Sequence, residues 1–174
     1  MAAKWLYWFD ELNSGHNDLV GKKCANLGEL TRLRLRVPPG FAISVEGYER
    51  FMEETGAGEA IRAYVRENRE RLHEVKAQVE ASRHIRGLIE SREMPTGMRE
   101  ELHHTYEELK NRCPGDELSV AVRSSGAVSM PGQMESYLNV RREAVLLQRI
   151  IEVWGSAFTT RAIAFRLERG MEME

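Results

Sequence analysis

A glycine followed by two lysines stands at the predicted start of a helix near the beginning of the chain. These residues are Gly21, Lys22 and Lys23, and a helix is expected from Gly21 onward. The first turn of a helix has free backbone N–H groups and a partial positive charge, and a lysine adds a full charge. The segment therefore predicts a site for an anion such as a phosphate, although the Walker spacing of glycine and lysine is absent. The alternative is an ordinary helix start with two solvated lysines.

A second candidate is an arginine at the end of a predicted buried strand. The strand covers residues 118–123 and ends in Arg123, which Ser124, Ser125 and Gly126 follow directly. An arginine in such a place is costly unless it meets a negative charge, and its planar guanidinium suits phosphate oxygens. The serines and the glycine offer hydroxyls and accessible backbone N–H groups. Two interpretations stay open: Arg123 binds a phosphate, or it pairs with one of the chain's own carboxylates.

The segment after Gly126 is a loop rich in small residues that joins two predicted strands. It covers residues 127–135 and contains Ser129, Pro131 and Gly132. Small residues let a ligand approach the backbone closely, and a flexible loop can close over phosphates. The loop is longer than the roughly two to five residues of a common hairpin connection, which favours a functional role over an ordinary connection.

The elements that must position these residues alternate between short strands and helices. Strands are predicted at residues 5–9, 41–45, 118–123 and 136–140. Helices are predicted from Gly21 to the break at residues 37–40, and at 45–55, 58–90, 95–112 and 143–168. Residues 13–18 are predicted to be a polar loop. This order predicts an α+β (mixed α/β) fold, with a mixed sheet flanked by helices.

The middle of the chain is predicted to be a long, charged helical stretch. Its apolar residues follow helical spacing and form one stripe, made of Ile61, Tyr64, Val65, Leu72, Val75 and Val79. Gly87 and the turn at residues 94–97 are expected to interrupt it. The charged face also fits a helical interaction protein, but that function leaves the serines after Arg123 unexplained.

The composition excludes several classes of function. The 174 residues indicate one domain, and 25 Lys and Arg nearly balance 27 Asp and Glu, which argues against a general nucleic-acid binder. No apolar run approaches the roughly 18 residues of a membrane span. Cys24 and Cys113 lack zinc-site spacing and are expected to be reduced thiols in a cytoplasmic protein. The adjacent His103 and His104 point in different directions on a helix, so no metal site is predicted.

Four segments of the sequence, taken in order, resemble one known family. They read VGKKCANLGEL from Val20, VPPGFAIS from Val37, VAVRSSGAVSMPGQMESYLNV from Val120 and VWGSAFTTRAIAFR from Val153. Together they resemble the N-terminal nucleotide-binding region of phosphoenolpyruvate synthase and pyruvate phosphate dikinase, a region shared by rifampin phosphotransferases and phenylphosphate synthases. The resemblance runs from about residue 17 to residue 166.

The resemblance implies that residues 1–174 form a single N-terminal lobe of an ATP-grasp fold, with a helical segment at about 58–112. It implies that ATP is the ligand and that Lys23 and Arg123 contact its phosphates, with Ser124 beside them. Lys22 stands where the family usually has glycine, so it is a second candidate lysine.

The same resemblance gives the loop a role. The stretch from Gly126 to Met134 matches the family's loop that covers the triphosphate, and Gly132, Gln133 and Met134 match backbone contacts to it.

The activity implied by the resemblance is transfer of a phosphoryl group from ATP to an enzyme histidine. The family's acidic Mg²⁺ ligands lie in a second lobe, beyond Glu174, and no histidine here has the family's phosphohistidine context. The chain by itself is therefore expected to be inactive or nearly so, and to need a partner subunit or the missing C-terminal lobe and phosphohistidine domain. The alternative function is a non-catalytic binding or regulatory subunit that docks on a partner carrying the second lobe.

Overall fold

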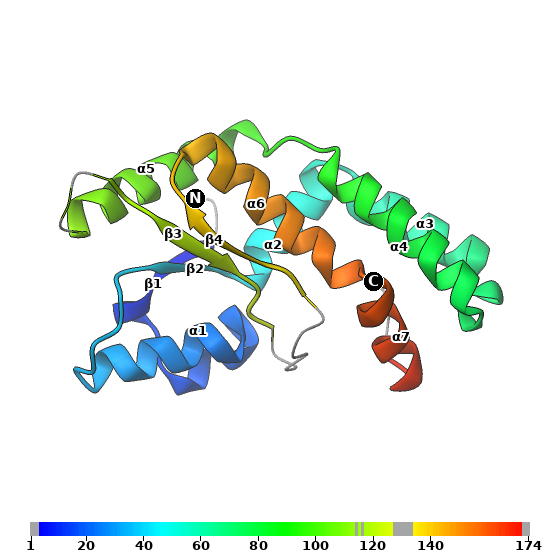
Figure 1. Ribbon diagram of the computed structural model, residues 1–174, viewed down its shortest axis with the longest axis horizontal. Coiled ribbons are helices and arrows are strands. Elements are labelled where there is room, and N and C mark those ends of the chain that lie inside the picture. Colours follow the sequence, from blue (N-terminus) through cyan, green and yellow to red (C-terminus); the bar gives the residue numbers. More distant parts are fainter. Residues whose placement is uncertain (1–3, 114, 116, 127–133, 172–174) are drawn as a thin grey trace.

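The computed structural model of the chain describes residues 4–113, 115, 117–126 and 134–171 (Figure 1). These residues form helices and two small antiparallel strand pairs, so the predicted α+β class is confirmed. The strands are β1 (Leu6–Trp8), β2 (Phe41–Ile43), β3 (Val120–Arg123) and β4 (Ser136–Val140). β1 pairs with β2 and β3 pairs with β4, in place of the single mixed sheet that the sequence predicted.

The β3–β4 hairpin places one predicted site residue at its open end. Val120 lies opposite Val140, and Arg123 lies opposite Ser136. The last residue of β3 and the first residue of β4 are therefore held together by the strand pairing. Whatever fixes the start of β4 also fixes the backbone of Arg123.

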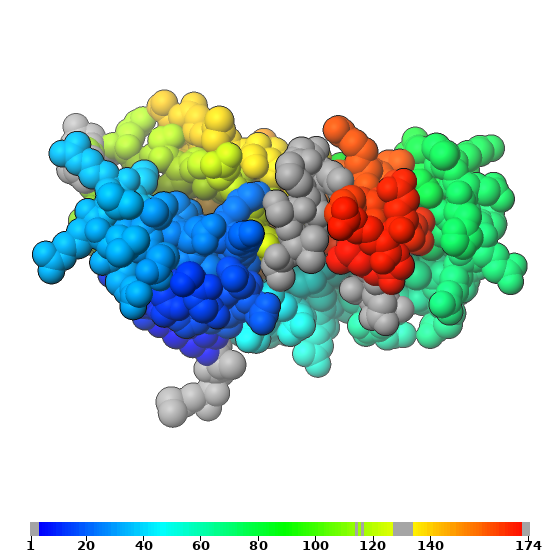
Figure 2. Space-filling view, turned by 90° about the horizontal axis from the view of Figure 1, so that it is seen from below, coloured from blue at the N-terminus to red at the C-terminus, as the bar shows by residue number. Residues whose placement is uncertain are grey.

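Helices lie on both sides of the strand pairs. They are α1 (Asn17–Arg32), α2 (Val45–Glu54), α3 (Ala57–Asn68), α4 (Val75–Glu90), α5 (Thr96–Arg112), α6 (Glu143–Gly155) and α7 (Thr160–Glu168). α1 packs against β2, whereas α6 packs against both β3 and β4. Figure 1 shows α1 on one side of the strands and α6 on the other, with α3 and α4 side by side at one end. In the view of Figure 2, α1 (blue) and α7 (red) lie at the same face of the molecule.

The predicted helix over residues 58–90 is in fact two helices. A 3-10 turn at Arg71–His73 separates α3 from α4, and the buried Leu72 anchors this turn in the core. Folding back lets both helices bury one face against each other and against the core. The helical phase restarts after the turn, so the predicted single stripe is wrong: Val75 and Val79 are exposed, by 72% and 43%.

Other predicted boundaries also shift. α1 begins at Asn17, inside the predicted polar loop, which holds a 3-10 turn at Ser14–His16. α4 continues through Gly87 without interruption. The predicted helix at 143–168 is α6 and α7, separated by a 3-10 turn at Ser156–Phe158. The hydroxyl of Thr159 accepts the Ala162 N–H at 3.2 Å, a local cap that starts a new helix instead of continuing the old one.

Two clusters of buried apolar side chains hold these elements together. The main cluster lies between the helices and the strand pairs and includes Trp5, Phe51, Tyr106 and Phe158. A smaller cluster joins α1 to the β1–β2 pair and contains Leu12, Val20, Ala25 and Ala42. The smaller cluster fixes α1, which carries the two predicted site lysines. In the part of the chain that the structure describes, no helix is both long and apolar enough to cross a membrane.

Candidate functional site

A close backbone contact brings the lysine segment (residues 21–24) and the serine segment (residues 124–126) together. Gly21 interrupts the helical geometry of α1, with φ 76° and ψ 159°, a conformation that is essentially restricted to glycine. A Cβ atom at this position would lie 2.3 Å from the carbonyl carbon and oxygen of Ser125. Glycine is therefore required both by the backbone conformation and by the space that Ser125 leaves.

Three hydrogen bonds join the turn after Gly21 to the serine segment. The backbone N–H of Lys22 donates to the carbonyl oxygen of Gly126 at 3.1 Å. The backbone N–H of Cys24 donates to the hydroxyl oxygen of Ser125 at 3.1 Å. The ammonium group of Lys23 donates to the carbonyl oxygen of Ser124 at 3.0 Å, across 101 positions of sequence.

These bonds correct one expectation from the sequence. The N–H groups at this helix start were predicted to bind an anion, but those of Lys22 and Cys24 are satisfied by the serine segment. The positive charge that stays available comes from side chains. An ammonium group has three donors, so Lys23 keeps two after its bond to Ser124. The two lysines thus differ: the side chain of Lys23 is held at the serine segment, and Lys22 contributes its backbone.

Arg123 lies at the end of β3 directly before the serine segment. β3 was predicted to be buried, but its residues alternate in exposure and the side chain of Arg123 is exposed. α6 packs against β3, but Ala121 and Arg123 are both exposed, so only alternate residues of this strand are covered. Among the described residues, the guanidinium of Arg123 has no hydrogen bond or ion pair. The alternative of a carboxylate partner within the chain therefore has no support from these residues.

The remaining predicted site residues lie around the same hairpin end. Ser124 is buried, and its carbonyl oxygen holds Lys23. Met134 is half-buried and stands two residues before β4. Gly132 and Gln133 lie outside the described residues.

The two cysteines are free thiols, as the sequence predicted. Burial raises the pKa of the Cys24 thiol above its ordinary value, and the hydrogen bond with Ser125 and the charge of Lys23 only partly offset this effect. Cys24 therefore stays protonated at neutral pH, and its role here is to pack beside the serine segment.

A group of possible metal ligands lies elsewhere, between α5 and α6. His103, Glu107 and Glu143 place their ligand atoms within 4.8 Å of one another. The Nδ1 atom of His103 lies 2.8 Å from the Glu143 carboxylate, and Glu107 pairs with Lys110. Neither glutamate was predicted from the sequence as a ligand, although the four-residue spacing of His103 and Glu107 places these two residues on one helix face.

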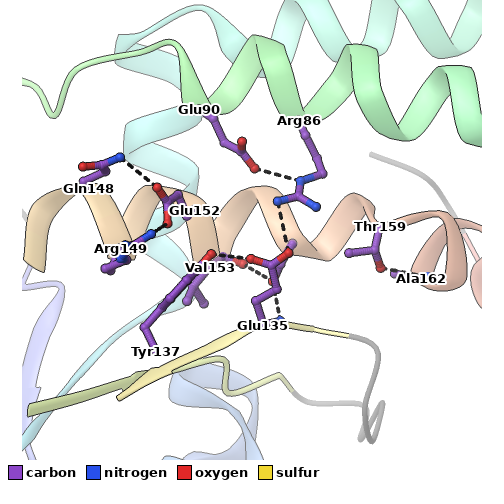
Figure 3. A network of polar contacts seen from close by, with 11 residues as sticks. Arg86, Glu90, Glu135, Tyr137, Gln148, Arg149, Glu152, Val153, Thr159 and Ala162 are labelled. Atoms are coloured by element: carbon purple, nitrogen blue, oxygen red, sulfur yellow. Dashed lines mark hydrogen bonds and ion pairs between the residues drawn. The ribbon is translucent and has the colours of Figure 1, made fainter. Parts of the chain in front are cut away.

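A polar network behind the hairpin was not predicted from the sequence (Figure 3). Glu135, just before β4, forms an ion pair with Arg86 of α4 at 3.1 Å. Its backbone N–H donates to the hydroxyl of Ser156 at 3.0 Å, and its carboxylate accepts the hydroxyl of Tyr137. Burial, followed by the hydrogen bonds to Glu135 and Glu152, raises the pKa of Tyr137, so the phenol remains a donor.

A comparison with known proteins matches most of this chain to one family. Residues 17–174 match the family described as pyruvate phosphate dikinase, AMP/ATP-binding domain. The chain belongs to this family. The match begins at the first residue of α1 and includes the lysine segment, the serine segment and the network around Glu135. The resemblance found from the four sequence segments is therefore confirmed.

Several curated relatives carry names that fit the family. A probable phosphoenolpyruvate synthase of Methanocaldococcus jannaschii is 35% identical over 98% of this chain. The phosphoenolpyruvate synthase of Pyrococcus furiosus is 32% identical over 99% of the chain, and a probable one of Archaeoglobus fulgidus is 37% identical over 97%. The chain spans only 15%, 26% and 23% of the length of these three relatives.

Proposed function

We propose that this chain is the N-terminal ATP-grasp lobe of a dikinase-type phosphotransferase, and that Lys23 and Arg123 bind the phosphates of ATP. The observation that carries the proposal is the contact of Gly21 with Ser125, which brings the lysine segment against the residues that follow Arg123. A polyphosphate needs several converging positive charges. Two cations from distant parts of the chain thus flank one short piece of backbone.

Each cation is suited to a different part of this task. Lys23 is oriented by its bond to Ser124 and has two N–H donors left for phosphate oxygens. Arg123 is exposed, has no described partner, and can offer its planar fork to two oxygens of one phosphate. Both groups neutralise charge that would otherwise oppose phosphoryl transfer. Ser124 positions Lys23, and Gly132, Gln133 and Met134 complete the proposed phosphate contacts by their match to the family loop.

Mg²⁺ does not fit the described residues of this site. Mg²⁺ prefers carboxylate and other oxygen ligands, but residues 21–26 and 123–126 contain no Asp or Glu. The nearby Glu135 is already engaged by Arg86 and Tyr137. We therefore assign no step to a metal held by these residues, and we place the Mg²⁺ ligands of the complete enzyme outside them.

We extend the proposal to the whole protein on the names of the relatives. Transfer of a phosphoryl group from ATP to an enzyme histidine would need the second lobe and a phosphohistidine domain, supplied by further sequence or by a partner subunit. The chain covers about a quarter or less of the relatives, in line with this need. Its free thiols suit the reducing cytoplasm, where we place the protein.

Calorimetric titration of the chain with ATP tests the proposal. Arg123→Ala should weaken binding by about ten- to a hundredfold, since a hydrogen bond to a charged group is worth about 1.5–3 kcal/mol. Arg99→Ala, at an exposed arginine of α5, serves as the control and should bind like the parent. Lys23→Met should weaken binding more than Lys22→Met. A parent chain that binds ATP no more tightly than the Arg123→Ala variant would contradict the proposal.

A non-catalytic docking subunit is the second candidate, and exposed apolar side chains favour it. Leu33 and Leu35 after α1 and Leu138 on the hairpin are exposed by 61%, 56% and 72%. Such side chains are suited to contact another protein or lobe. Gel filtration with the second lobe separates the two functions: a complex that gains ATP hydrolysis supports the phosphotransferase, and a stable complex indifferent to ATP supports the docking subunit.

A further inference from the structure

Two contacts of Glu135 tie the start of β4 to the helical layer, and a third contact joins Glu135 to β4 itself. Glu135 bonds through its backbone to Ser156, between α6 and α7, and through its carboxylate to Arg86 of α4 and to Tyr137 of β4 itself. Ser156 is fully buried and its hydroxyl also donates to the carbonyl oxygen of Val153 at 2.7 Å. Figure 3 shows Glu135 beside β4, on the side that faces α6 and α4.

The partners of Glu135 are themselves fixed. Arg86 also pairs with Glu90, one helical turn further along α4, at 2.8 Å. α6 approaches α4 so closely here that a Cβ atom at Gly155 would lie 2.7 Å from the Glu90 carboxylate. Arg86 is therefore held in place from its own helix before it reaches Glu135. The ion pair of Arg86 with Glu135 is partly shielded from solvent, because the two side chains are 28% and 36% exposed.

Strand pairing in the hairpin links the anchored Glu135 to Arg123. Ser136 follows Glu135 directly and is the strand partner of Arg123. The guanidinium of Arg123 has no described partner of its own, so its position depends on the backbone of β3. That backbone is held on one side by Ser136 and on the other by the contact of the serine segment with Gly21.

We propose that Glu135 is a positioning residue for phosphate binding, which acts through its ion pair with Arg86 to hold Arg123 in the orientation that receives a phosphate. The proposal rests on the proposed function, since it needs Arg123 to be a phosphate ligand. We assign Glu135 no contact with the nucleotide. Its carboxylate acts on the hairpin end, so its loss weakens ATP binding while the core stays intact.

ATP titration of Glu135→Gln tests this role. Glutamine keeps the size of the side chain but loses the ion pair, and we expect about a three- to tenfold weaker affinity, in the range of coupling between residues that share a network. The matched control is Glu117→Gln, which removes the ion pair with Arg141 (3.0 Å) near the other end of the same hairpin. It should leave ATP affinity unchanged. Arg86→Met breaks the same ion pair from the other side and keeps the test valid if Glu135→Gln fails to fold.

A second titration separates positioning from a merely structural role. In the Arg123→Ala background, Glu135→Gln should cause no further loss, because the residue it positions is gone. An equal loss in both backgrounds, or an unchanged affinity of both Glu135→Gln and Arg86→Met in the parent, overturns the proposal. If Arg123→Ala itself binds ATP like the parent, the proposed function fails instead, so the two failures are distinguishable.

Discussion

The contact between Gly21 and Ser125 makes a sharp prediction for the variant Gly21→Ala. The added methyl group would start 2.3 Å from the Ser125 carbonyl, where carbon atoms in contact normally lie about 3.5–4 Å apart. The backbone of α1 or of the serine segment must therefore move by more than an ångström, a shift of about 1.2 Å at the least. Such a move breaks the bonds from Lys22 to Gly126 and from Cys24 to Ser125.

The size of the effect follows from these separate losses. Alanine in the left-handed conformation of Gly21 costs about 1–3 kcal/mol, and two lost hydrogen bonds cost about 1 kcal/mol each. We expect Gly21→Ala to lower the free energy of unfolding by about 3–5 kcal/mol, a large share of the roughly 5–15 kcal/mol of an ordinary domain. ATP affinity should fall as well, because the lysine segment separates from the serine segment.

Urea denaturation at equilibrium measures this loss, and Gly87→Ala is the matched control. Gly87 lies inside α4 and has nothing within 4 Å of its would-be Cβ, so alanine there should stabilise the chain by about 0.5–1 kcal/mol. If Gly21→Ala lowers the free energy of unfolding by less than about 1 kcal/mol, the two segments are not packed as rigidly as this reasoning requires.

Two further predictions concern single buried groups. Burial lowers the pKa of Arg166, and its Nη1 atom is buried without a hydrogen-bond partner among the described residues. Arg166→Met should therefore leave the urea midpoint unchanged or raise it. A clear fall of the midpoint would show that the charge of Arg166 is compensated. Because burial raises the pKa of Cys24, less thiolate forms at a given pH. At pH about 8, iodoacetamide should therefore label Cys24 more slowly in the folded chain than in the chain unfolded in urea. Equal labelling rates in the two states would contradict the burial of this thiol.

Much of the fold and the site could be predicted from short stretches of sequence. Strands and most helices are marked by the spacing of apolar residues, as in α2 and α5, because that spacing reports which side of one element is buried. Residue type and neighbours marked the two lysines and Arg123 as candidates for an anion site, and the family resemblance then assigned Lys23 and Arg123 to the phosphates. The family was found from four short segments, and the comparison confirmed it.

Other features depend on residues that are distant in the sequence. The turn that splits α3 from α4 arises because both helices gain by packing on each other, which no single helical pattern reveals. The exposure of Arg123 depends on which face of the hairpin α6 covers. The roles of Glu135 and Gly21 depend on distant partners. Glu135 pairs with Arg86 of α4, and Gly21 packs against Ser125.

Sequence by itself therefore determined the kinds of element, the family and the charged residues suited to phosphate. Only the tertiary structure decided that Lys23 uses one donor on Ser124, that two helix-start N–H groups are already satisfied, and that Glu135 anchors the hairpin. The physical reason is one of range. Backbone preference and apolar periodicity act over a few residues, whereas a hydrogen bond across 101 positions exists only after two separately formed elements have packed.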